Sequence, residues 1–368
     1  MSDIKKEAYV EVDKNLIVET VFPDTEDVKF HNVRNAPFEL YNLYGEQDEI
    51  YRRLPKAVAE ETSAGVNKLA KETAGVRVRF STDSGYILIK TKMPVIARNS
   101  HMTLLMSGGF DLYEDTPTGS RFVKAFMPPY KMEDGYEQII RFGSRKMRYF
   151  TINFPLHSVV SEFYVGLQED SQIGAGKPYK NKKPIIIYGS SIVHGTGASR
   201  PGLAYSNIIS RKLDMDVVNL GFSGNAKAEL PIMNYLASLE MSLFVYDYDH
   251  NAPNPEYLAE THKRGFDIMR AAHPDIPIIL ISRPNVATNP SKAEERKKII
   301  IDTYRAALDA GDKNVYYIDG ESFFLGMEGE SDFVIDGVHP NDVGYYLMAE
   351  GIGNTIVQAI ERMGGSLE

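Results

Sequence analysis

The first half of the chain alternates apolar and polar residues in short segments. In residues 76–82 (VRVRFST) and 86–93 (YILIKTKM) roughly every second position is apolar, and the sequence DSG between them is typical of a turn. Further short runs, mostly separated by Gly, Pro, Asp or Asn, follow at 102–108, 121–127, 137–143, 149–155 and 162–167. This pattern predicts an antiparallel β-sandwich or jelly roll. Residues 54–74 allow a helix and receive no assignment.

The second half has a different pattern, in which short apolar strands alternate with helical segments of ten residues or more. The strands are predicted at 184–189, 216–221, 243–248, 277–282 and 315–320. The helical segments are predicted at 202–213, 228–239, 255–272, 291–310 and 341–362. Apolar strands covered on both faces by crossover helices form a parallel, doubly wound sheet. The fold class is therefore α/β, with a five-stranded parallel sheet.

A polar segment separates the two patterns. Residues 171–183 (SQIGAGKPYKNKK) are rich in Gly and Lys and are predicted to be a linker. We therefore expect two domains, a β-sandwich accessory domain at 1–175 and an α/β catalytic domain at 176–368.

Composition narrows the class of protein. The 368 residues are 43% hydrophobic and 25% charged, which is typical of a globular protein, and no run of about 18 apolar residues is present. A net charge of −9 leaves no basic stripe for nucleic acid and argues against an anionic membrane as partner. The absence of cysteine excludes disulfides and thiolate catalysis.

The first 15 residues lack the apolar core of a secretory signal. We therefore expect a cytoplasmic protein, or a secreted one if a leader precedes the mature chain. Homo-oligomerisation is left open.

Candidate chemistry lies in the loops that follow the predicted parallel strands, where ligands bind in such sheets. The first strand ends in Gly189-Ser190-Ser191, where a serine can present its hydroxyl at the rim of the sheet or simply cap a helix. Beyond the fifth strand, Asp336 and His339 stand three residues apart. A carboxylate can hold an imidazole in the tautomer that accepts a proton from a serine.

Two further loops hold groups that could stabilise a negative oxygen. Gly224 follows the second strand and could offer a backbone N–H, and Asn251 follows the third and could offer its amide; both residue types are also ordinary turn formers. Nucleophile, base, acid and oxyanion donors in this order are the parts needed for acyl transfer. His194, Arg200 and Arg283 are candidate substrate contacts, although surface arginines are commonly only solvated.

These blocks resemble those of the SGNH (GDSL-type) hydrolases. The family's first block usually reads Gly-Asp-Ser, so the resemblance implies that Ser191 is the nucleophile and that Ser190 replaces the usual aspartate. Gly224 corresponds to the second block, and Asp336 with His339 corresponds to the fourth. The third block, usually Gly-x-Asn-Asp, is changed to DHNAP here, and Asn251 is its best match.

The chain also resembles a subgroup of that family. The stretches GGFDLYED (108–115), ASRPG (198–202) and VVNLGFSGN (217–225) are similar to those of members whose hydrolase domain follows a β-sandwich. The resemblance implies a flavodoxin-like three-layer α/β/α hydrolase domain and a jelly-roll-like first domain.

The resemblance also implies an activity. We expect a serine esterase that removes a small acyl group, an acetyl group first of all, from a carbohydrate through a Ser-His-Asp triad and an acyl-enzyme. The substrate is then a small-molecule or oligosaccharide ester, and no metal or cofactor is expected. A lipase or thioesterase and an inactive glycan-binding protein are the alternatives.

Overall fold

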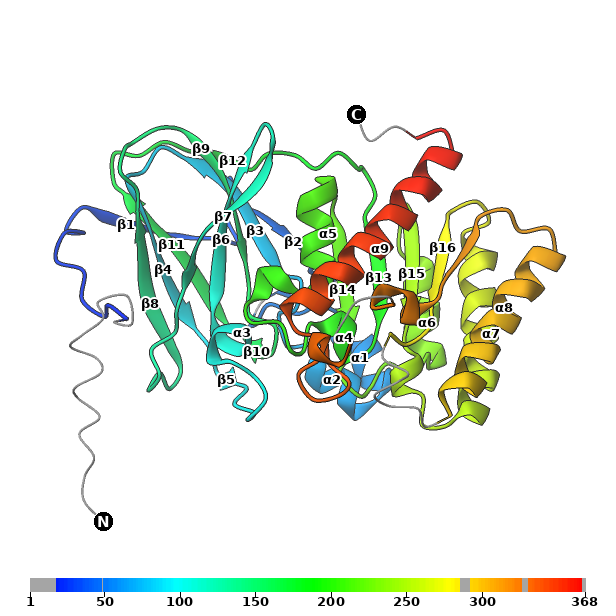
Figure 1. Ribbon diagram of the computed structural model, residues 1–368. Coiled ribbons are helices and arrows are strands. Elements are labelled where there is room, and N and C mark those ends of the chain that lie inside the picture. Colours follow the sequence, from blue (N-terminus) through cyan, green and yellow to red (C-terminus); the bar gives the residue numbers. More distant parts are fainter. Residues whose placement is uncertain (1–17, 48, 285–291, 326–329, 366–368) are drawn as a thin grey trace, which may run out of the picture.

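The computed structural model of the protein describes residues 18–47, 49–284, 292–325 and 330–365 and places two layered regions side by side (Figure 1). The N-terminal residues on which the leader expectation depends, and Ser291 at the start of one predicted helix, lie outside the described residues. Among the described residues, no helix combines the length and apolar character needed to cross a membrane.

The first region is an antiparallel β-sandwich. One sheet has the order β1 (Val28–Asn32), β11 (Glu162–Gln168), β4 (Tyr86–Lys92) and β8 (Gly135–Arg141). The other has the order β12 (Ile173–Ala175), β3 (Arg77–Thr82), β9 (Arg148–Asn153), β6 (Phe110–Thr116) and β7 (Gly119–Phe126), with β2 (Glu39–Tyr41) also paired to β3. β5 (Val95–Ile96) pairs with β10 (Ser158–Val159). The predicted sandwich is confirmed.

Side-chain alternation explains how β3 contributes to two interfaces. Val78 and Phe80 point into the core between the sheets. Arg77 and Arg79 alternate with them and therefore point to the opposite face. Both arginines are buried nonetheless, because the second region covers that face.

One predicted strand is wrong. Residues 102–108 contain the short helix α3 (Leu104–Gly108) instead of a strand. The hydroxyl of Thr103 accepts a hydrogen bond from the backbone N–H of Met106 at 3.1 Å and so caps the helix. Met106 fills the core beneath it. A short apolar run has no period of its own, and here the cap decides between helix and strand.

The unassigned segment 54–74 forms two short helices, α1 (Lys56–Thr62) and α2 (Ala64–Leu69). Ala59 and Val66 belong to the same buried cluster as one face of the parallel sheet. Part of the first half of the chain thus packs as a component of the second region, as Figure 1 shows for α1 and α2. The expected linker also contains β12. The boundary at 175 stays a prediction.

The second region is a three-layer α/β/α domain. Its parallel sheet has the order β14 (Val217–Gly221), β13 (Ile185–Gly189), β15 (Leu243–Asp247), β16 (Ile278–Ile281) and β17 (Val315–Ile318). Helices α6 (Leu230–Ser238), α7 (Pro255–Ala272) and α8 (Ala293–Asp309) cover one face, and α5 (Tyr205–Leu213) and α9 (Asp342–Arg362) cover the other. The predicted flavodoxin-like three-layer α/β/α domain with a five-stranded parallel sheet is confirmed.

The topology locates the crevice. The chain leaves β13 to form β14 on one side and then returns to form β15 on the other, so the order reverses at β13. In open α/β sheets, ligands bind beyond the carboxyl ends of the strands at such a reversal. The loops after β13 and its two neighbours are therefore the place to look for a site.

A buried arginine joins the two regions. Arg53 is completely buried and donates through Nη1 to the carbonyl oxygens of Asn219 (3.2 Å) and Gly221 (3.0 Å) on β14. Its Nη2 donates to the carbonyl oxygen of Leu69 at 2.8 Å. Because a buried charge is costly unless it is hydrogen-bonded, these bonds fix the sandwich side of the chain on the sheet edge.

Candidate active site

The two serines after β13 have different roles in the structure. Ser190 is the N-cap of the short helix α4 (Ser191–His194): its Oγ accepts from the N–H of Ile192 at 3.2 Å, and it is fully buried. Its own N–H donates to the carbonyl oxygen of Asp247 at the end of β15, at 3.0 Å. Ser191 follows as the first helical residue. Helix capping therefore explains why a serine stands at position 190, but it does not explain the serine at position 191.

A glycine lets α4 lie close to the sheet. A Cβ on Gly221, the last residue of β14, would overlap the backbone nitrogen of His194. Because glycine has no Cβ, β14 and α4 can approach closely enough for Ser191 to sit at the rim of the crevice.

Ser191, His339 and Asp336 form one hydrogen-bonded chain. His339 Nε2 lies 2.8 Å from Ser191 Oγ, and His339 Nδ1 lies 2.7 Å from Asp336 Oδ2. The other oxygen of Asp336 accepts from the backbone N–H groups of Val338 (3.0 Å) and His339 (2.9 Å). The structure thus brings together the three residues that the sequence pairs only by their positions after strands.

Electrostatics fix the direction of this chain. Burial alone would raise the pKa of Asp336, but the hydrogen bonds from the N–H and ring of His339 outweigh it and lower the pKa. An ionised carboxylate accepts the proton on Nδ1, which leaves the lone pair of Nε2 directed at Ser191 Oγ. The arrangement can therefore remove a proton from Ser191.

Ser191 opens into a pocket of about 410 Å³. Of the other residues proposed from the sequence, Gly224, Asn251, Arg283 and His339 also line it. Arg283 is itself mostly buried, and its Nε lies 3.4 Å from Asp249 Oδ2. The volume of the pocket exceeds that of an acetyl group, and the pocket is open to solvent.

Gly224 and Asn251 have donors that an oxyanion could use. Gly224 has φ of +70°, and no atom lies within 4 Å of the position that a Cβ would occupy, so its backbone is open to a ligand. Within the described part of the chain, no hydrogen bond from the N–H of Ser191 or Gly224 to a protein acceptor is found. Asn251 donates one amide N–H to the carbonyl oxygen of Phe222 at 2.9 Å, which leaves its second N–H available.

The structure does not bring His194 to the pocket. His194 is fully buried, and its Nε2 lies 2.7 Å from the carbonyl oxygen of Leu156 in the sandwich. The expectation of a substrate contact does not fit this position, because His194 faces the first region, away from Ser191 three residues before it.

Arg200 is also placed elsewhere, and its contacts explain two of the sequence motifs. Its Nη1 lies 2.7 Å from Asp111 Oδ2 and 2.6 Å from the hydroxyl of Tyr113, and its guanidinium lies 3.9 Å from the ring centre of Phe122. Asp111 and Tyr113 belong to the segment FDLY. The segments around 111 and 200 thus lock the sandwich to the α/β domain, and Arg200 is absent from the lining of the pocket.

A buried cluster that the sequence analysis missed supports the pocket wall. Glu72 Oε2 lies 3.1 Å from His157 Nδ1 and 3.2 Å from His194 Nε2, and the two imidazoles stack at 4.1 Å. His157 Nε2 lies 2.9 Å from Thr196 Oγ1, and Thr196 lines the pocket. Residues of the sandwich side therefore hold the loop that follows α4.

The same cluster is the one group of described residues whose spacing could surround a metal ion. Burial alone would raise the pKa of Glu72, but hydrogen bonds from His157 and His194 hold the pKa well below its usual range. The 2.7 Å contact of His194 Nε2 with a carbonyl oxygen requires a proton on that nitrogen, so its lone pair is not available to a metal. The contacts fit a hydrogen-bonded support better than a metal site.

The sandwich also supplies a wall of the pocket itself. His101 and Met102 line the pocket, and the ring of His101 lies 6.2 Å from that of His339 at an angle of 20°. Nothing in the surrounding sequence RNSHMT indicates this, because the contact depends on how the two regions pack. Access to Ser191 is shaped by both regions.

Buried titratable groups give the fold a specific pH dependence. Burial lowers the pKa of His194 to about 3, of His250 to about 4 and of His262 to about 3. Burial also raises the pKa of Asp247 to about 7, and the nearby Asp249 adds to that rise. The three histidines are therefore neutral in the folded protein, and Asp247 holds a proton into the neutral range.

Acidification is expected to destabilise the protein below pH 6.5. The unfolded chain protonates His194, His250 and His262 near pH 6.5, which the folded chain resists, whereas Asp247 acts in the opposite direction because its folded pKa is raised. Near pH 5 these four groups together take up about two protons when the protein unfolds. The free energy of unfolding therefore falls by about 2–3 kcal/mol for each pH unit of acidification. Urea unfolding between pH 7 and pH 4.5 measures this slope, and a flat or rising stability on acidification would contradict it.

Comparisons with known protein families match both regions of the chain. Residues 182–357 match the sequence profile of the GDSL-like lipase/acylhydrolase family, and residues 28–173 match the GxDLY profile, described as the N-terminus of SGNH-hydrolase-type esterases. No curated protein sequence matches the chain.

Solved structures share the whole architecture. A GDSL-like lipase from Bacteroides ovatus is 26% identical with a TM-score of 0.81, and the match covers 91% of this chain and 98% of that one. A salicylyl-acyltransferase from a tetracycline biosynthetic pathway is 18% identical with a TM-score of 0.74, covering 92% and 98%. An acetyl xylan esterase from the rumen bacterium Butyrivibrio proteoclasticus is 11% identical with a TM-score of 0.60, covering 92% and 99%. The last two likenesses show the fold alone.

Proposed function

We propose that the chain, of which residues 182–357 match the GDSL-like lipase/acylhydrolase family, is a serine esterase that removes a small acyl group, an acetyl group first of all, from a carbohydrate. The observation that carries the proposal is the chain of contacts from Ser191 Oγ through His339 to Asp336, at 2.8 and 2.7 Å, on the wall of an open pocket. Its geometry matches what general-base activation of a serine requires.

The mechanism follows from these contacts. His339 Nε2 takes the proton of Ser191 as Oγ attacks the acyl carbon, and Asp336 stabilises the imidazolium. His339 then gives that proton to the departing alcohol oxygen, which leaves the acyl group on Ser191. Water attacks the acyl-enzyme with His339 again as base, releasing the carboxylic acid and restoring the serine.

The negative oxygen that forms in both steps needs hydrogen-bond donors. The N–H groups of Ser191 and Gly224 and the second amide N–H of Asn251 belong to residues that line the pocket and could serve as these donors. Such donors act strongly because they are already oriented before the reaction begins.

The lining of the pocket includes groups that could bind a hydroxylated substrate. Among the described residues that line it, only Met102 and Val338 carry aliphatic side chains, and the rest include Thr196, Ser223 and Arg283. Sugar hydroxyls would find hydrogen-bonding partners among these polar groups, and the apolar surface between them could hold a short acyl group. Proteins of similar fold include an acetyl xylan esterase, which makes acetylated xylan fragments the first substrates to test.

Substrate preference is tested by incubating the protein with acetylated xylo-oligosaccharides, p-nitrophenyl acetate, p-nitrophenyl palmitate and acetyl-coenzyme A. We expect acetate release from the oligosaccharides, detected as loss of acetyl mass, and a higher kcat/KM for the acetate ester than for the palmitate. Preference for palmitate would favour the lipase alternative, and preference for the thioester would favour a thioesterase. No turnover of any substrate would favour the glycan-binding alternative.

Removing the Asn251 amide should affect turnover more than binding. We expect Asn251→Ala to lower kcat for p-nitrophenyl acetate by about 10²–10³-fold with little change in KM, because the donor acts mainly on the transition state. Asn254→Ala on the same loop is the matched control: it removes the cap of α7, where Asn254 Oδ1 accepts from Tyr257 N at 2.8 Å, and should cost about 1 kcal/mol of stability and no turnover. Equal kcat for both variants would remove Asn251 from the oxyanion site.

A further inference from the structure

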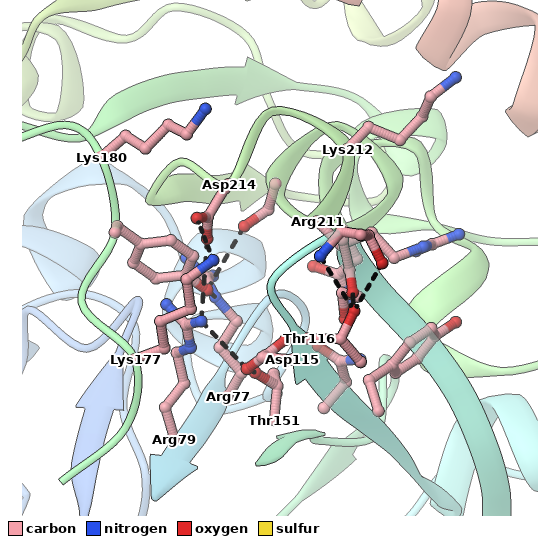
Figure 2. Close-up of a pocket in the computed structure, with 18 of the residues that line it drawn as sticks. Arg77, Arg79, Asp115, Thr116, Thr151, Lys177, Lys180, Arg211, Lys212 and Asp214 are labelled. Carbon is pink, nitrogen blue, oxygen red and sulfur yellow. Dashed lines mark hydrogen bonds and ion pairs between the residues drawn. The ribbon is translucent and has the colours of Figure 1, made fainter. Parts of the chain in front are cut away.

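A second cavity, of about 250 Å³, lies in the seam between the sandwich and the α/β domain (Figure 2). We call it the seam cavity; it is lined by β3, β9 and the turn between β6 and β7 from the sandwich, and by the segment 177–180 and the end of α5 from the rest of the chain. Asp214, which lines it, precedes β14, whereas Ser191 follows the end of β13. The seam cavity therefore lies toward the amino ends of the parallel strands, and it shares no lining residue with the Ser191 pocket among the described residues.

The seam cavity is strongly cationic in a protein whose net charge is −9. Its acidic lining residues are Asp115 and Asp214. Its cationic lining residues are Arg77, Arg79, Lys177, Lys180, Arg211 and Lys212. A concave surface with an excess of one sign of charge concentrates ligands of the opposite sign.

Part of this charge is structural. Arg77 donates to Asp216 Oδ1 at 2.5 Å, to the carbonyl oxygen of Val217 at 3.0 Å and, through Nε, to the hydroxyl of Tyr179 at 2.6 Å. Every nitrogen of its guanidinium is satisfied by the protein, with Gly75 as a further acceptor. Arg77 therefore joins the two regions and is not a binding group for a ligand.

Arg79 is different, because its donors exceed its acceptors. Its side chain is 1% exposed, and only Nη2 is bonded, to Asp115 Oδ2 at 3.0 Å. Asp214 lies farther away, at 3.9 Å from the same nitrogen. In the described part of the chain, Nε and Nη1 are buried with no acceptor. Buried charged donors without partners are costly, which points to an acceptor supplied from outside the chain.

Arg211, across the cavity, is a second guanidinium with few acceptors among the described residues. It donates to the carbonyl oxygen of Gly202 and lies over the ring of Tyr113 at 5.0 Å. No carboxylate of the described residues lies within ion-pair distance of it. Figure 2 shows Arg77, Arg79 and Lys177 gathered on one side of the cavity and Arg211 with Thr116 on the other. An anion between the two groups would be held from both regions of the protein.

Neutral polar groups complete the lining. Thr116, Thr118 and Ser120 in the β6–β7 turn offer hydroxyls, and Asn207 has a buried Oδ1 with no partner among the described residues. A volume of about 250 Å³ is below the roughly 300–1,000 Å³ typical of sites for drug-sized ligands, so the ligand is of monosaccharide size. We propose that the seam cavity binds a small hydroxylated oxyanion, a sugar phosphate or a sugar acid, between Arg79 and Arg211.

The proposal is tested by isothermal titration of the Ser191→Ala protein, in which hydrolysis cannot interfere. The probes are glucose 6-phosphate, glucuronate, inorganic phosphate and uncharged glucose. We expect glucose 6-phosphate or glucuronate to bind at least about tenfold more tightly than inorganic phosphate, with no binding of glucose, and to weaken as NaCl is added. The tighter of the two charged sugars identifies the phosphate or the carboxylate as the recognised group.

Variants assign the binding to this cavity. Arg211→Gln is expected to weaken the tighter ligand about tenfold or more, because a charge-assisted hydrogen bond is lost. Arg305→Gln, an equal charge change on the exposed face of α8, should leave the dissociation constant unchanged. If Arg211→Gln melts early without ligand, Lys177→Gln replaces it, since the Lys177 side chain is 36% exposed and tolerates substitution more easily.

The outcomes separate this proposal from the esterase proposal. Binding that is equal in wild type and Arg211→Gln, or binding of inorganic phosphate as tight as that of the sugars, would overturn it. So would the absence of binding by every charged probe. None of these results depends on turnover, so the seam cavity and the esterase activity can fail independently.

Discussion

Replacement of Ser191 by alanine is expected to lower kcat for p-nitrophenyl acetate by about 10⁵–10⁶-fold, the scale of a lost serine nucleophile in enzymes of this chemistry. The variant removes the Oγ that lies 2.8 Å from His339 Nε2, so no acyl-enzyme can form. The activity that remains comes from the oxyanion donors and from substrate binding. Steady-state kinetics at pH 7.5, with circular dichroism to verify folding, measures the loss.

The adjacent serine is a matched control. Ser190→Ala removes the cap bond to the N–H of Ile192 and should cost about 1 kcal/mol of unfolding free energy while kcat changes little. Near wild-type turnover in Ser191→Ala, or an equal loss in Ser190→Ala, would contradict the assignment of the nucleophile.

Replacement of Asp336 by asparagine has the second largest expected effect, a fall in kcat of about 10⁴-fold. The asparagine amide can donate to His339 Nδ1, which would place the ring proton on Nε2, opposite Ser191 Oγ. The base is then in the wrong tautomer, although the 2.7 Å spacing to position 336 can persist. The KM for p-nitrophenyl acetate should change much less than kcat.

A double variant tests whether the three residues act as one unit. Because Asp336 acts only through His339 on Ser191, the combination of Ser191→Ala with Asp336→Asn should be no slower than Ser191→Ala alone. Multiplied losses in the double variant would mean that Asp336 contributes by another route.

The architecture was largely predictable because each half of the chain repeats one pattern of apolar and polar residues. Strands buried on both faces are apolar throughout, as in β13, where Ile186 and Tyr188 face one cluster and Ile185 and Ile187 face the other. The error at 102–108 has a local cause: five apolar or small residues satisfy either period, and the Thr103 cap selects the helix.

The candidate site could be proposed from the sequence only where chemistry and topology coincide. Ser191, Asp336 and His339 were proposed because each follows a parallel strand at its carboxyl end, and the structure brings their side chains together. His194 and Arg200 are in the same loops, yet Leu156 and Asp111 of the sandwich side draw them away from the pocket. Burial by a distant part of the chain leaves no sign in the local sequence.

The seam cavity illustrates the same limit. On β3 the alternation of Arg77 and Arg79 with apolar residues is typical of a solvent-facing side. Packing of the two regions buries that side and gives Arg77 its partner Asp216. The alternation of residues predicts which side chains point away from the sandwich core, but only the assembled structure shows what covers them.

The central claim, that Ser191 is an activated nucleophile, is tested most directly by labelling with a fluorophosphonate and measuring the mass of the intact protein and its peptides. The structure predicts one adduct per chain, located on Ser191, absent in Ser191→Ala and formed more slowly in Asp336→Asn. An unlabelled wild-type protein, or an adduct that persists on another residue in Ser191→Ala, would contradict the claim.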